Sequence, residues 1–271
     1  MPQPSTTPPP AEPNDEGPID LDLGLLVGKR FKIVKKLSSG GCGSVFKVKD
    51  AKQGIFAGLK AENNNVAGGT VLKLEARILR AFNNRKCCVH DVNYVHRDVK
   101  PSNFAIGIDL DRNRMVYILD FGLGREYTIV KDGKLVHRTA RQDALFRGTL
   151  KYSSINTLKK SEQGRSDDLW SLMYILAELI KLLPWEDVND DKDIVLKSKE
   201  ETKDASLFPQ FEDYIQVTNY LRTFEYATRP DYAKLFTIFE GMMHKRKIKH
   251  QHLYDWESQK IMPSITDNFI S

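Results

Sequence analysis

Apolar and polar residues alternate in the first third of the chain. Residues 31–34 alternate strictly, residues 45–48 resume the pattern after a glycine-rich stretch, and residues 57–60 form a third short run. A period of two is typical of strands that bury one face. The pattern therefore predicts a small sheet of about three strands, and we expect ordered structure to begin near Leu25.

Later apolar residues recur at the spacing of a helix. Val71, Leu74 and Ile78 follow this spacing and predict a helix that ends near Phe82. Further helices are expected in the apolar stretch that ends at Pro184, over residues 214–224, and from residue 229 onward.

The longest apolar stretch, from Leu169 to Trp185, does not predict a membrane span. Glu178 and Lys181 interrupt it, whereas a bilayer span needs about 20 predominantly apolar residues. A buried core helix is expected there. The N-terminus lacks the charged-then-apolar pattern of a signal peptide. Its first residues are rich in Pro, Ser and Thr, so we expect residues 1–24 to be disordered.

The charge composition constrains the kinds of binding partner only broadly. The 271 residues include 41 Lys and Arg and 36 Asp and Glu, which gives a net charge of +5. This mild excess permits acidic partners and does not predict nucleic-acid binding. The basic run over residues 244–250 is read as a solvated helix end, with a nuclear address or an acidic-partner patch as alternatives.

The three cysteines favour a reducing compartment. Cys42, Cys87 and Cys88 have neither the spacing of a disulfide framework nor that of a zinc site. We therefore expect plain thiols in a monomer of the cytoplasm, or of the nucleus if the basic run is an address.

Two short motifs carry the chemistry. His96-Arg97-Asp98 leads to Asn103 with the spacing H-R-D-L-x-x-x-N, and Val99 stands at the Leu position. Asp120-Phe121-Gly122 follows an apolar run at residues 115–119 and fits D-F-G. In this order the two motifs are typical of the catalytic loop and the metal-binding loop of a protein kinase.

The residue types fit phosphoryl transfer. An Asp accepts the proton of the attacking hydroxyl, a Lys neutralises charge on the transferring group, and an Asn and a second Asp hold magnesium against nucleotide phosphates. These roles are assigned to Asp98, to Lys100, and to Asn103 with Asp120.

A glycine-rich turn precedes these motifs. Gly40, Gly43 and Val45 fit the kinase pattern G-x-G-x-x-G-x-V, with Ser38 in place of its first glycine. Glycine lets the main chain approach phosphates closely, although a plain β-hairpin would show the same pattern. The candidate nucleotide-binding residues here are Leu37, Gly40, Gly41, Gly43 and Val45.

Lys60 and Glu75 are the candidate phosphate clamp. Ala57 to Lys60 resembles the V-A-I-K strand, and Glu75 lies on the predicted helix that follows. An ion pair would direct the lysine toward the phosphates. The alternative is a solvated Lys and a solvated Glu, which is the commoner fate of either residue in isolation.

Several further segments resemble one kinase family. Gly148-Thr149 followed by Ser154-Ile155-Asn156 is similar to the form that the casein kinase I group carries where most kinases have A-P-E. Residues 101–107, 119–127 and 164–172 look most like the tau-tubulin kinase branch. The resemblance covers roughly residues 28–260.

This resemblance implies a two-lobed α+β fold and ATP-dependent transfer to Ser or Thr of proteins, with ATP and Mg²⁺ as cofactors. The small lobe would span residues 25–84, the large lobe 96–262, and a tail 263–271. Asp168 would brace the catalytic loop, or serve as a carboxylate favoured at a helix N-terminus. An acidic or already phosphorylated substrate is expected if basic side chains face it, namely Lys151, Lys159, Lys160 and Arg165.

One departure from the family lies between the Glu75 helix and the catalytic loop. Residues 83–95 stand where the family places two strands, the adenine-binding hinge and two helices, which need roughly 50 residues. Residues 83–88 resemble the family's segment just after the first helix, and residues 89–95 resemble the end of the helix before the catalytic loop. We therefore place a deletion junction at residues 85–95. Thirteen extended residues still span about 43 Å, so the connection is sterically possible.

The missing hinge leaves three explanations open. The chain is an active kinase with weak ATP binding, a pseudokinase that serves as a binding scaffold, or an active enzyme whose transcript is incomplete at this point. The intact catalytic residues favour catalysis, whereas the missing hinge favours the scaffold.

Overall fold

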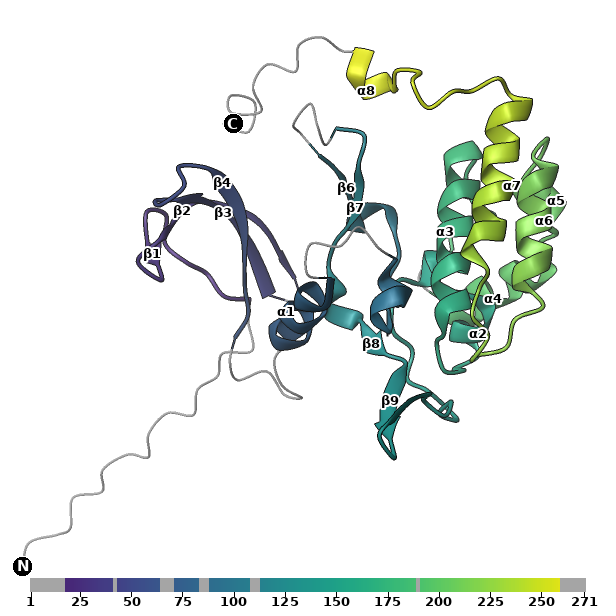
Figure 1. The fold of residues 1–271 in the computed structure, drawn as a ribbon, viewed down its shortest axis with the longest axis horizontal. Coiled ribbons are helices and arrows are strands. Elements are labelled where there is room, and N and C mark those ends of the chain that lie inside the picture. Colours follow the sequence, from purple (N-terminus) through teal and green to yellow (C-terminus); the bar gives the residue numbers. More distant parts are fainter. Residues whose placement is uncertain are drawn as a thin grey trace, which may run out of the picture. The chain divides into compact units, whose positions relative to one another are not determined.

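The structure is a computed structural model that describes residues 18–40, 43–63, 71–82, 88–107, 113–188 and 191–258. It forms two compact units, residues 1–83 and 84–271, and each is described by itself (Figure 1). The four-stranded sheet lies in the first unit, and the two longest helices lie in the second with three short strand pairs. This distribution confirms the predicted α+β class.

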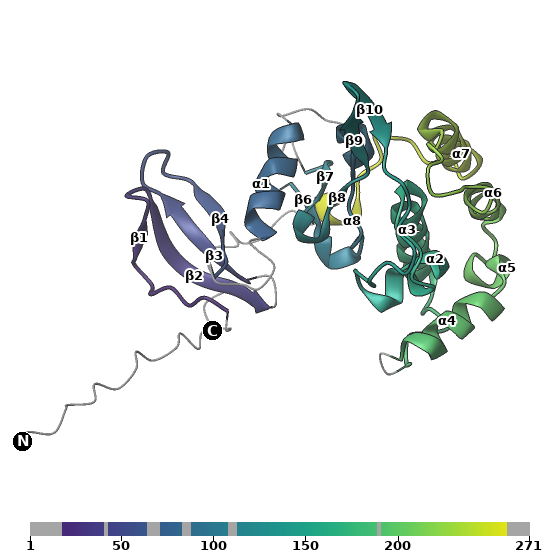
Figure 2. The same ribbon diagram turned by 90° about the horizontal axis from the view of Figure 1, so that it is seen from below.

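The first unit is built on one antiparallel sheet. Its strands are β1 (Leu26–Val27), β2 (Phe31–Gly40), β3 (Gly43–Asp50) and β4 (Phe56–Ala61), in the order β1-β2-β3-β4. The three long strands are the predicted ones, and β1 adds two residues at the edge. Figure 2 shows them as curved neighbouring arrows.

The core of this sheet is small. Ile33, Phe46 and Val48 are its fully buried apolar residues, and they come from one face of β2 and β3. The two-residue period of the sequence places them on that face. Leu59 and Ala61 of β4 pack against them.

Residues 18–24 differ from the prediction of a disordered segment over residues 1–24. Leu21 packs against the sheet core, and the amide of Gly24 donates to the carbonyl of Ile33 at 2.9 Å. Burial of one leucine and a ladder-like hydrogen bond offset the cost of ordering this segment. Residues 1–17 lie outside the described residues.

Helix α1 (Val71–Phe82) completes the first unit and ends where the sequence predicts. Ile78 is its fully buried residue. The carboxylate of Glu62 accepts from the amides of Val71 and Leu72 at 3.1 and 2.9 Å. These amides open the helix and lack partners within it, so the carboxylate caps them.

The predicted deletion junction, residues 85–95, lies at the start of the second unit. Its residues 85–87 lie outside the described residues. Residues 88–95 form the 3-10 helix Val89–Val92 and strand β5 (Tyr94–Val95), which pairs with β8 (Arg125–Glu126) in the second unit. In the part of the chain that the structure describes, β4 pairs with β3 alone.

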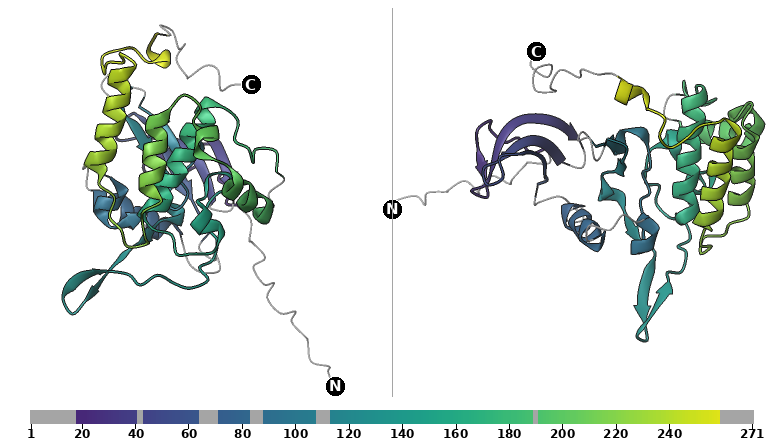
Figure 3. Two further views of the ribbon diagram at one scale, coloured as in Figure 1. Left: turned by 90° about the vertical axis from the view of Figure 1, so that its right-hand side faces the viewer. Right: turned by 45° about the horizontal axis from the view of Figure 1, so that its top comes forward.

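Two further strand pairs lie in this unit. β6 (Phe104–Ile106) pairs with β7 (Val116–Ile118), and β9 (Thr128–Lys131) pairs with β10 (Lys134–His137). The β9–β10 hairpin stands away from the helices of its unit (Figure 3). Short 3-10 helices connect these strands at Pro101–Asn103 and Phe121–Leu123.

The remainder of the unit is helical. Figure 2 shows α3 with the other large helices arranged around it. Met173, Tyr174 and Ala177 of α3 lie in the buried apolar core, to which α4 and α6 also contribute. The helices are α2 (Ile155–Leu158), α3 (Arg165–Ile180), α4 (Lys192–Glu201), α5 (Asp204–Leu207), α6 (Glu212–Leu221), α7 (Tyr232–Lys245) and α8 (Asp255–Ser258).

Local sequence explains where the two longest helices start. The carboxylate of Asp167 accepts from the amide of Gly164 at 2.6 Å at the start of α3. Asp231 accepts from the amide of Lys234 at 3.0 Å at the start of α7, and Pro230 precedes it. Asp231 is therefore the N-cap of α7, and Asp is favoured there because its carboxylate accepts from an amide that lacks a partner within the helix. Helix α3 ends at Ile180, five residues before Trp185, which is buried in the following loop.

The remaining expectations concern cysteines, the basic run and the membrane. Cys88 is an exposed free thiol, while Cys42 and Cys87 lie outside the described residues. The basic run spans the end of α7, where residues 244–250 are exposed, as a solvated helix end requires. Among the described helices, none combines the length and the apolar character needed to cross a bilayer.

Candidate active site

Asp98 lies at the centre of a hydrogen-bonded group in the second unit. The hydroxyl of Thr149 donates to Oδ1 of Asp98 at 2.8 Å, and Nζ of Lys100 lies 2.8 Å from Oδ2. Lys100 also donates to Oγ1 of Thr149 at 3.1 Å. The amide group of Asn103 donates to the backbone carbonyl of Asp98 at 2.9 Å. The structure thus brings together three of the predicted site residues, and Thr149 joins them.

Asp168 holds the backbone just before Asp98. Its carboxylate accepts from the amides of His96 at 2.6 Å and Arg97 at 2.8 Å. These contacts brace the catalytic loop as the resemblance implies. Asp168 also lies in the first turn of α3, so both expected roles are compatible with the structure. Burial raises the pKa of Asp168, but His90 and the amide of His96 outweigh this and the pKa is lowered overall.

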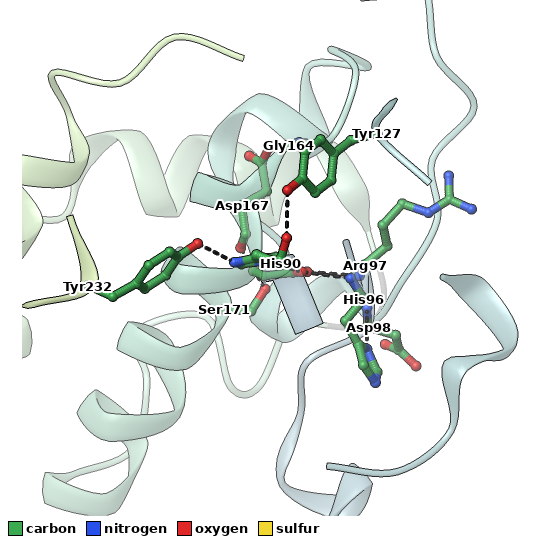
Figure 4. Close-up of polar contacts among 10 residues, drawn as sticks. His90, His96, Arg97, Asp98, Tyr127, Gly164, Asp167, Ser171 and Tyr232 are labelled. Carbon is green, nitrogen blue, oxygen red and sulfur yellow. Dashed lines mark hydrogen bonds and ion pairs between the residues drawn. The ribbon is translucent and has the colours of Figure 1, made fainter. Parts of the chain in front are cut away.

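His90 is the third partner of Asp168. Its Nε2 donates to Oδ2 of Asp168 at 3.0 Å, and its Nδ1 donates to the hydroxyl of Tyr232 at 2.5 Å. The hydroxyl of Tyr127 donates to the carbonyl of His90 at 2.5 Å (Figure 4). Burial lowers the pKa of His90, yet Asp168 raises it to about 9 overall, with a smaller contribution from Cys88. The imidazolium form lets both ring nitrogens donate.

Asp120 lies next to Asn103 through the β6–β7 pair. The amide of Leu119 donates to the carbonyl of Asn103 at 2.8 Å, which fixes the residue before Asp120 beside Asn103. Asp120 adopts a left-handed backbone conformation (φ 59°), and its Oδ1 accepts from the amide of Gly122 at 3.2 Å. His96 donates from Nε2 to the carbonyl of Leu119 at 3.0 Å and joins the two motifs.

Carboxylate and amide oxygens are ligands that Mg²⁺ prefers, and Mg²⁺ uses one or two protein ligands together with substrate phosphates. Asn103 and Asp120 fit this donor set. Among the described residues, no group of three or more His, Cys, Asp or Glu could hold a metal ion.

Gly148 fits tightly against the catalytic loop. It has φ 111°, and a Cβ atom there would lie 2.5 Å from the carbonyl oxygen of Arg97. Arg97 itself has φ 68°, and its Nε donates to the carbonyl of Leu123 at 2.6 Å. The position next to Thr149 therefore requires glycine.

The first unit carries the predicted phosphate-binding residues. Nζ of Lys60 lies 2.9 Å from Oε2 of Glu75, so the ion pair forms and the solvated alternative is wrong. Gly43 has φ 97° and its missing Cβ leaves room for the carbonyl of Ala61. Leu37, Gly40 and Val45 lie on the same hairpin of β2 and β3, while Gly41 lies outside the described residues.

The cations expected to face a substrate mostly have partners. Nζ of Lys151 lies 2.5 Å from both Glu178 and Glu186. Arg165 is buried, stacks over Tyr127 and donates to a backbone carbonyl. Lys159 and Lys160 are more than half exposed, at 52% and 57%, and form surface pairs with Glu200 and Asp143.

Sequence reasoning gave no role to several residues of the site. Thr149 was part of a family motif, but its contact with Asp98 joins residues 51 positions apart. His90 meets Asp168 and Tyr232 at separations of 78 and 142 residues. Glu162 is buried and pairs with Arg125 and Arg141. No spacing in a single sequence marks such distant pairs.

Known proteins resemble this chain across most of its length. The protein kinase domain family matches residues 76–249. A putative serine/threonine-protein kinase of Caenorhabditis elegans is 35% identical over 306 residues, which covers 92% of this chain and 88% of the relative. A probable serine/threonine-protein kinase of Dictyostelium discoideum is 37% identical across 70% of this chain and 37% of the relative.

A further relative is named an inactive tau-tubulin kinase of Caenorhabditis elegans. It is 36% identical and covers 64% of this chain and 61% of its own length. The chain thus spans less than two thirds of this protein and of the Dictyostelium relative. The match of the kinase family together with the nearly full-length relative shows that the chain belongs to the protein kinase family, in its serine/threonine class.

Proposed function

We propose that this chain transfers the terminal phosphoryl group of ATP to a Ser or Thr hydroxyl of a protein, with Asp98 as the general base. The observation that carries the proposal is the convergence of Thr149, Lys100 and Asn103 on Asp98. These contacts orient the carboxylate before an acceptor arrives. A positioned carboxylate can accept the hydroxyl proton, and a neighbouring ammonium can neutralise charge on the transferring phosphoryl group.

We assign candidate nucleotide-binding residues within each unit, taken by itself. Asn103 and Asp120 would hold Mg²⁺, and bound Mg²⁺ would neutralise charge on the phosphates. In the first unit, Lys60 held by Glu75 supplies a cation for the phosphates, and the β2–β3 hairpin supplies backbone amides.

We further propose that adenine is bound weakly, because a hinge segment is missing around residues 85–95. In the described residues, β4 has β3 as its strand neighbour. β5 pairs with β8, and both of these strands lie in the second unit. The alignment with the Caenorhabditis elegans relative runs over 306 residues, more than the 271 of this chain. That relative therefore has additional residues within the matched span, which supports a deletion.

The second candidate function is a non-catalytic scaffold that retains the kinase fold for binding other proteins. The relative named an inactive tau-tubulin kinase favours this candidate. It also supports a place in the tau-tubulin branch of the casein kinase I group. The intact contacts of Asp98 favour catalysis, so phosphoryl transfer remains the proposed function.

The proposed substrate is an acidic or already phosphorylated protein segment. Lys159 and Lys160 can carry this preference, because their exposed ion pairs are worth only about 0–1 kcal/mol and can be exchanged for substrate anions. Lys151 and Arg165, which the sequence also suggested, are held within the fold. We place the protein in the cytoplasm, as a monomer.

The test compares phosphate ligands that carry a nucleobase with one that carries none. Mg-ATP, Mg-GTP and Mg-tripolyphosphate are titrated by calorimetry against the full chain, and phosphate transfer to casein is measured in parallel. Two lost adenine hydrogen bonds, at about 1–3 kcal/mol each, weaken ATP by roughly ten- to ten-thousand-fold. We therefore expect the three ligands to bind within about threefold of each other, with slow transfer.

A chain with a family-length insert at residues 83–95 is the matched comparison. We expect the insert to restore a preference for ATP over tripolyphosphate. Micromolar binding of ATP by the unmodified chain, well above that of tripolyphosphate, would show that adenine is recognised without the hinge. Transfer that is absent from both proteins would favour the scaffold.

A further inference from the structure

Lys199 of α4 is a buried lysine that the reaction scheme leaves without a role. It is only 4% exposed. Its Nζ donates to the carbonyls of Leu150 at 2.9 Å, Lys151 at 3.0 Å and Ser153 at 2.6 Å. An ammonium group has three N–H donors, and here each donor has one backbone acceptor.

Two aromatic rings enclose the same ammonium. Nζ lies 4.5 Å from the ring centre of Tyr174 and 4.9 Å from that of Trp185. Ring faces attract a cation at these distances. Burial lowers the pKa of the Lys199 ammonium well below its usual range. Three carbonyl oxygens and two ring faces act in the opposite direction, since a neutral amine has two N–H donors and would leave one oxygen without a partner.

The three carbonyls belong to one short segment. Leu150 to Tyr152 form a 3-10 helix, and the amide of Ser153 donates to the carbonyl of Leu150 at 3.3 Å. Lys199 donates to the carbonyls of Leu150, Lys151 and Ser153. Nε1 of Trp185 also donates to the carbonyl of Lys151, at 2.9 Å. The backbone of this segment is therefore fixed by side chains from two other elements.

This segment starts directly after Thr149. The amides of Tyr152 and Ser153 donate back to the carbonyl of Thr149 at 3.1 and 3.0 Å. The hydroxyl of Thr149 in turn contacts Asp98. A shift of the segment would therefore move Thr149 relative to the carboxylate, and would reshape the backbone that borders the place where an acceptor hydroxyl must enter.

We propose that Lys199 is a positioning residue of the acceptor site, which fixes the backbone of residues 150–153 and through it the contact of Thr149 with Asp98. The inference rests on the proposed function, because an acceptor site presupposes phosphoryl transfer. Burial of an ammonium is costly compared with an apolar side chain of similar length. A definite backbone shape at an acceptor site gives that cost a function.

The test uses the full chain and Lys199→Met, which keeps the length of the side chain and removes the donors. The matched control is Lys197→Met, since Lys197 lies on the same helix, is 75% exposed and forms a surface pair with Glu201. Hydrogen exchange is followed at the amides of Tyr152 and Ser153 and along α3. Binding of a fluorescein-labelled acidic peptide with one serine is measured by anisotropy without nucleotide.

We expect Lys199→Met to speed exchange of the Tyr152 and Ser153 amides by about tenfold or more, because each of three backbone acceptors loses one of its donors. Exchange along α3 is expected to change less than twofold. Peptide binding is expected to weaken about tenfold, whereas Lys197→Met matches the parent in both measurements. Trp185→Phe, which removes one donor to the carbonyl of Lys151, is expected to give an intermediate loss.

Unchanged exchange at Tyr152 and Ser153 in Lys199→Met would overturn the inference. Faster exchange with unchanged peptide binding would also overturn it, because Lys199 would then only stabilise the fold. If Lys199→Met fails to fold, the same two outcomes are decisive in Trp185→Phe. A parent chain that binds no peptide would overturn it as well, since no acceptor site would exist. Failure of the proposed function is distinguished by peptide binding without phosphate transfer.

Discussion

The hydroxyl of Thr149 donates to Oδ1 of Asp98 at 2.8 Å, while Lys100 holds the other oxygen of the same carboxylate. Both oxygens thus have a defined partner before any acceptor is bound. The contact also ties the segment after Gly148 to the catalytic loop. An acceptor hydroxyl that reaches Asp98 must fit beside Thr149. The position of the Thr149 side chain therefore influences how Asp98 can accept a proton from that hydroxyl.

Replacement of the proposed base should abolish most of the transfer. Asp98→Asn keeps the shape of the side chain but removes the proton acceptor, and general base catalysis contributes roughly 100- to 10 000-fold. We expect a loss of that order in phosphate transfer to casein, measured with radiolabelled ATP. Asp187→Asn is the control, because Asp187 is exposed and lies outside the proposed site. Equal rates for the parent and Asp98→Asn would refute the assignment.

Gly148→Ala should destabilise the second unit and reduce transfer. A methyl group at this position would lie 2.5 Å from the carbonyl oxygen of Arg97, and φ 111° is strained for alanine. Strain at such a position costs on the order of 1–3 kcal/mol before the clash is counted. We expect a clear drop in the melting temperature in a thermal scan.

The control for this substitution is Gly241→Ala. Gly241 lies in α7 with open space around its missing Cβ. Alanine there should stabilise the helix by about 0.5–1 kcal/mol. If both variants melted at the same temperature, the packing of Gly148 against Arg97 would not matter for stability.

His90 should make stability depend on pH. Its pKa is about 9 in the folded protein against 6.5 ordinarily, so the charged ring is favoured by folding. This contribution is complete below about pH 6.5 and is lost as the pH rises toward 9. A difference of this size corresponds to about 3 kcal/mol.

Urea unfolding of the parent and of His90→Gln at pH 6, 7.5 and 9 measures this contribution. We expect the free energy of unfolding of the parent to fall toward that of His90→Gln as the pH rises. His244→Gln serves as the control, because His244 is exposed at the end of α7. Parallel curves for the parent and His90→Gln would contradict the charged state of the ring.

Acidic flanks on a peptide should improve its phosphorylation. Each exposed cation contributes about 0–1 kcal/mol, so Lys159 and Lys160 together should give roughly a three- to tenfold gain in kcat/KM. The double variant Lys159→Ala, Lys160→Ala should lose the gain, whereas Lys197→Ala should keep it. High salt should reduce the effect, because it screens exposed charges. A gain that survives the double variant would assign the preference to other residues.

The sequence by itself determined the main strands of the first unit, helix α1 and the kinase motifs. The two-residue period over residues 31–48 and the helical spacing from Val71 identified the sheet and α1, because burial of one face imposes those periods. The spacing of Asp98, Asn103 and Asp120 identified the kinase motifs, since one loop and one turn present these residues locally. The helix caps at Gly164 and Asp231 are also local.

Only the tertiary structure decided which distant groups share a site. The contacts of Thr149 with Asp98, of His90 with Asp168, and of Lys199 with the carbonyls after Thr149 join residues that are 46 to 78 positions apart. It also decided that Lys151 pairs with Glu178, and that Leu21 packs on the sheet. Such contacts depend on how helices and loops pack, and packing is not encoded by the period or spacing of any one segment.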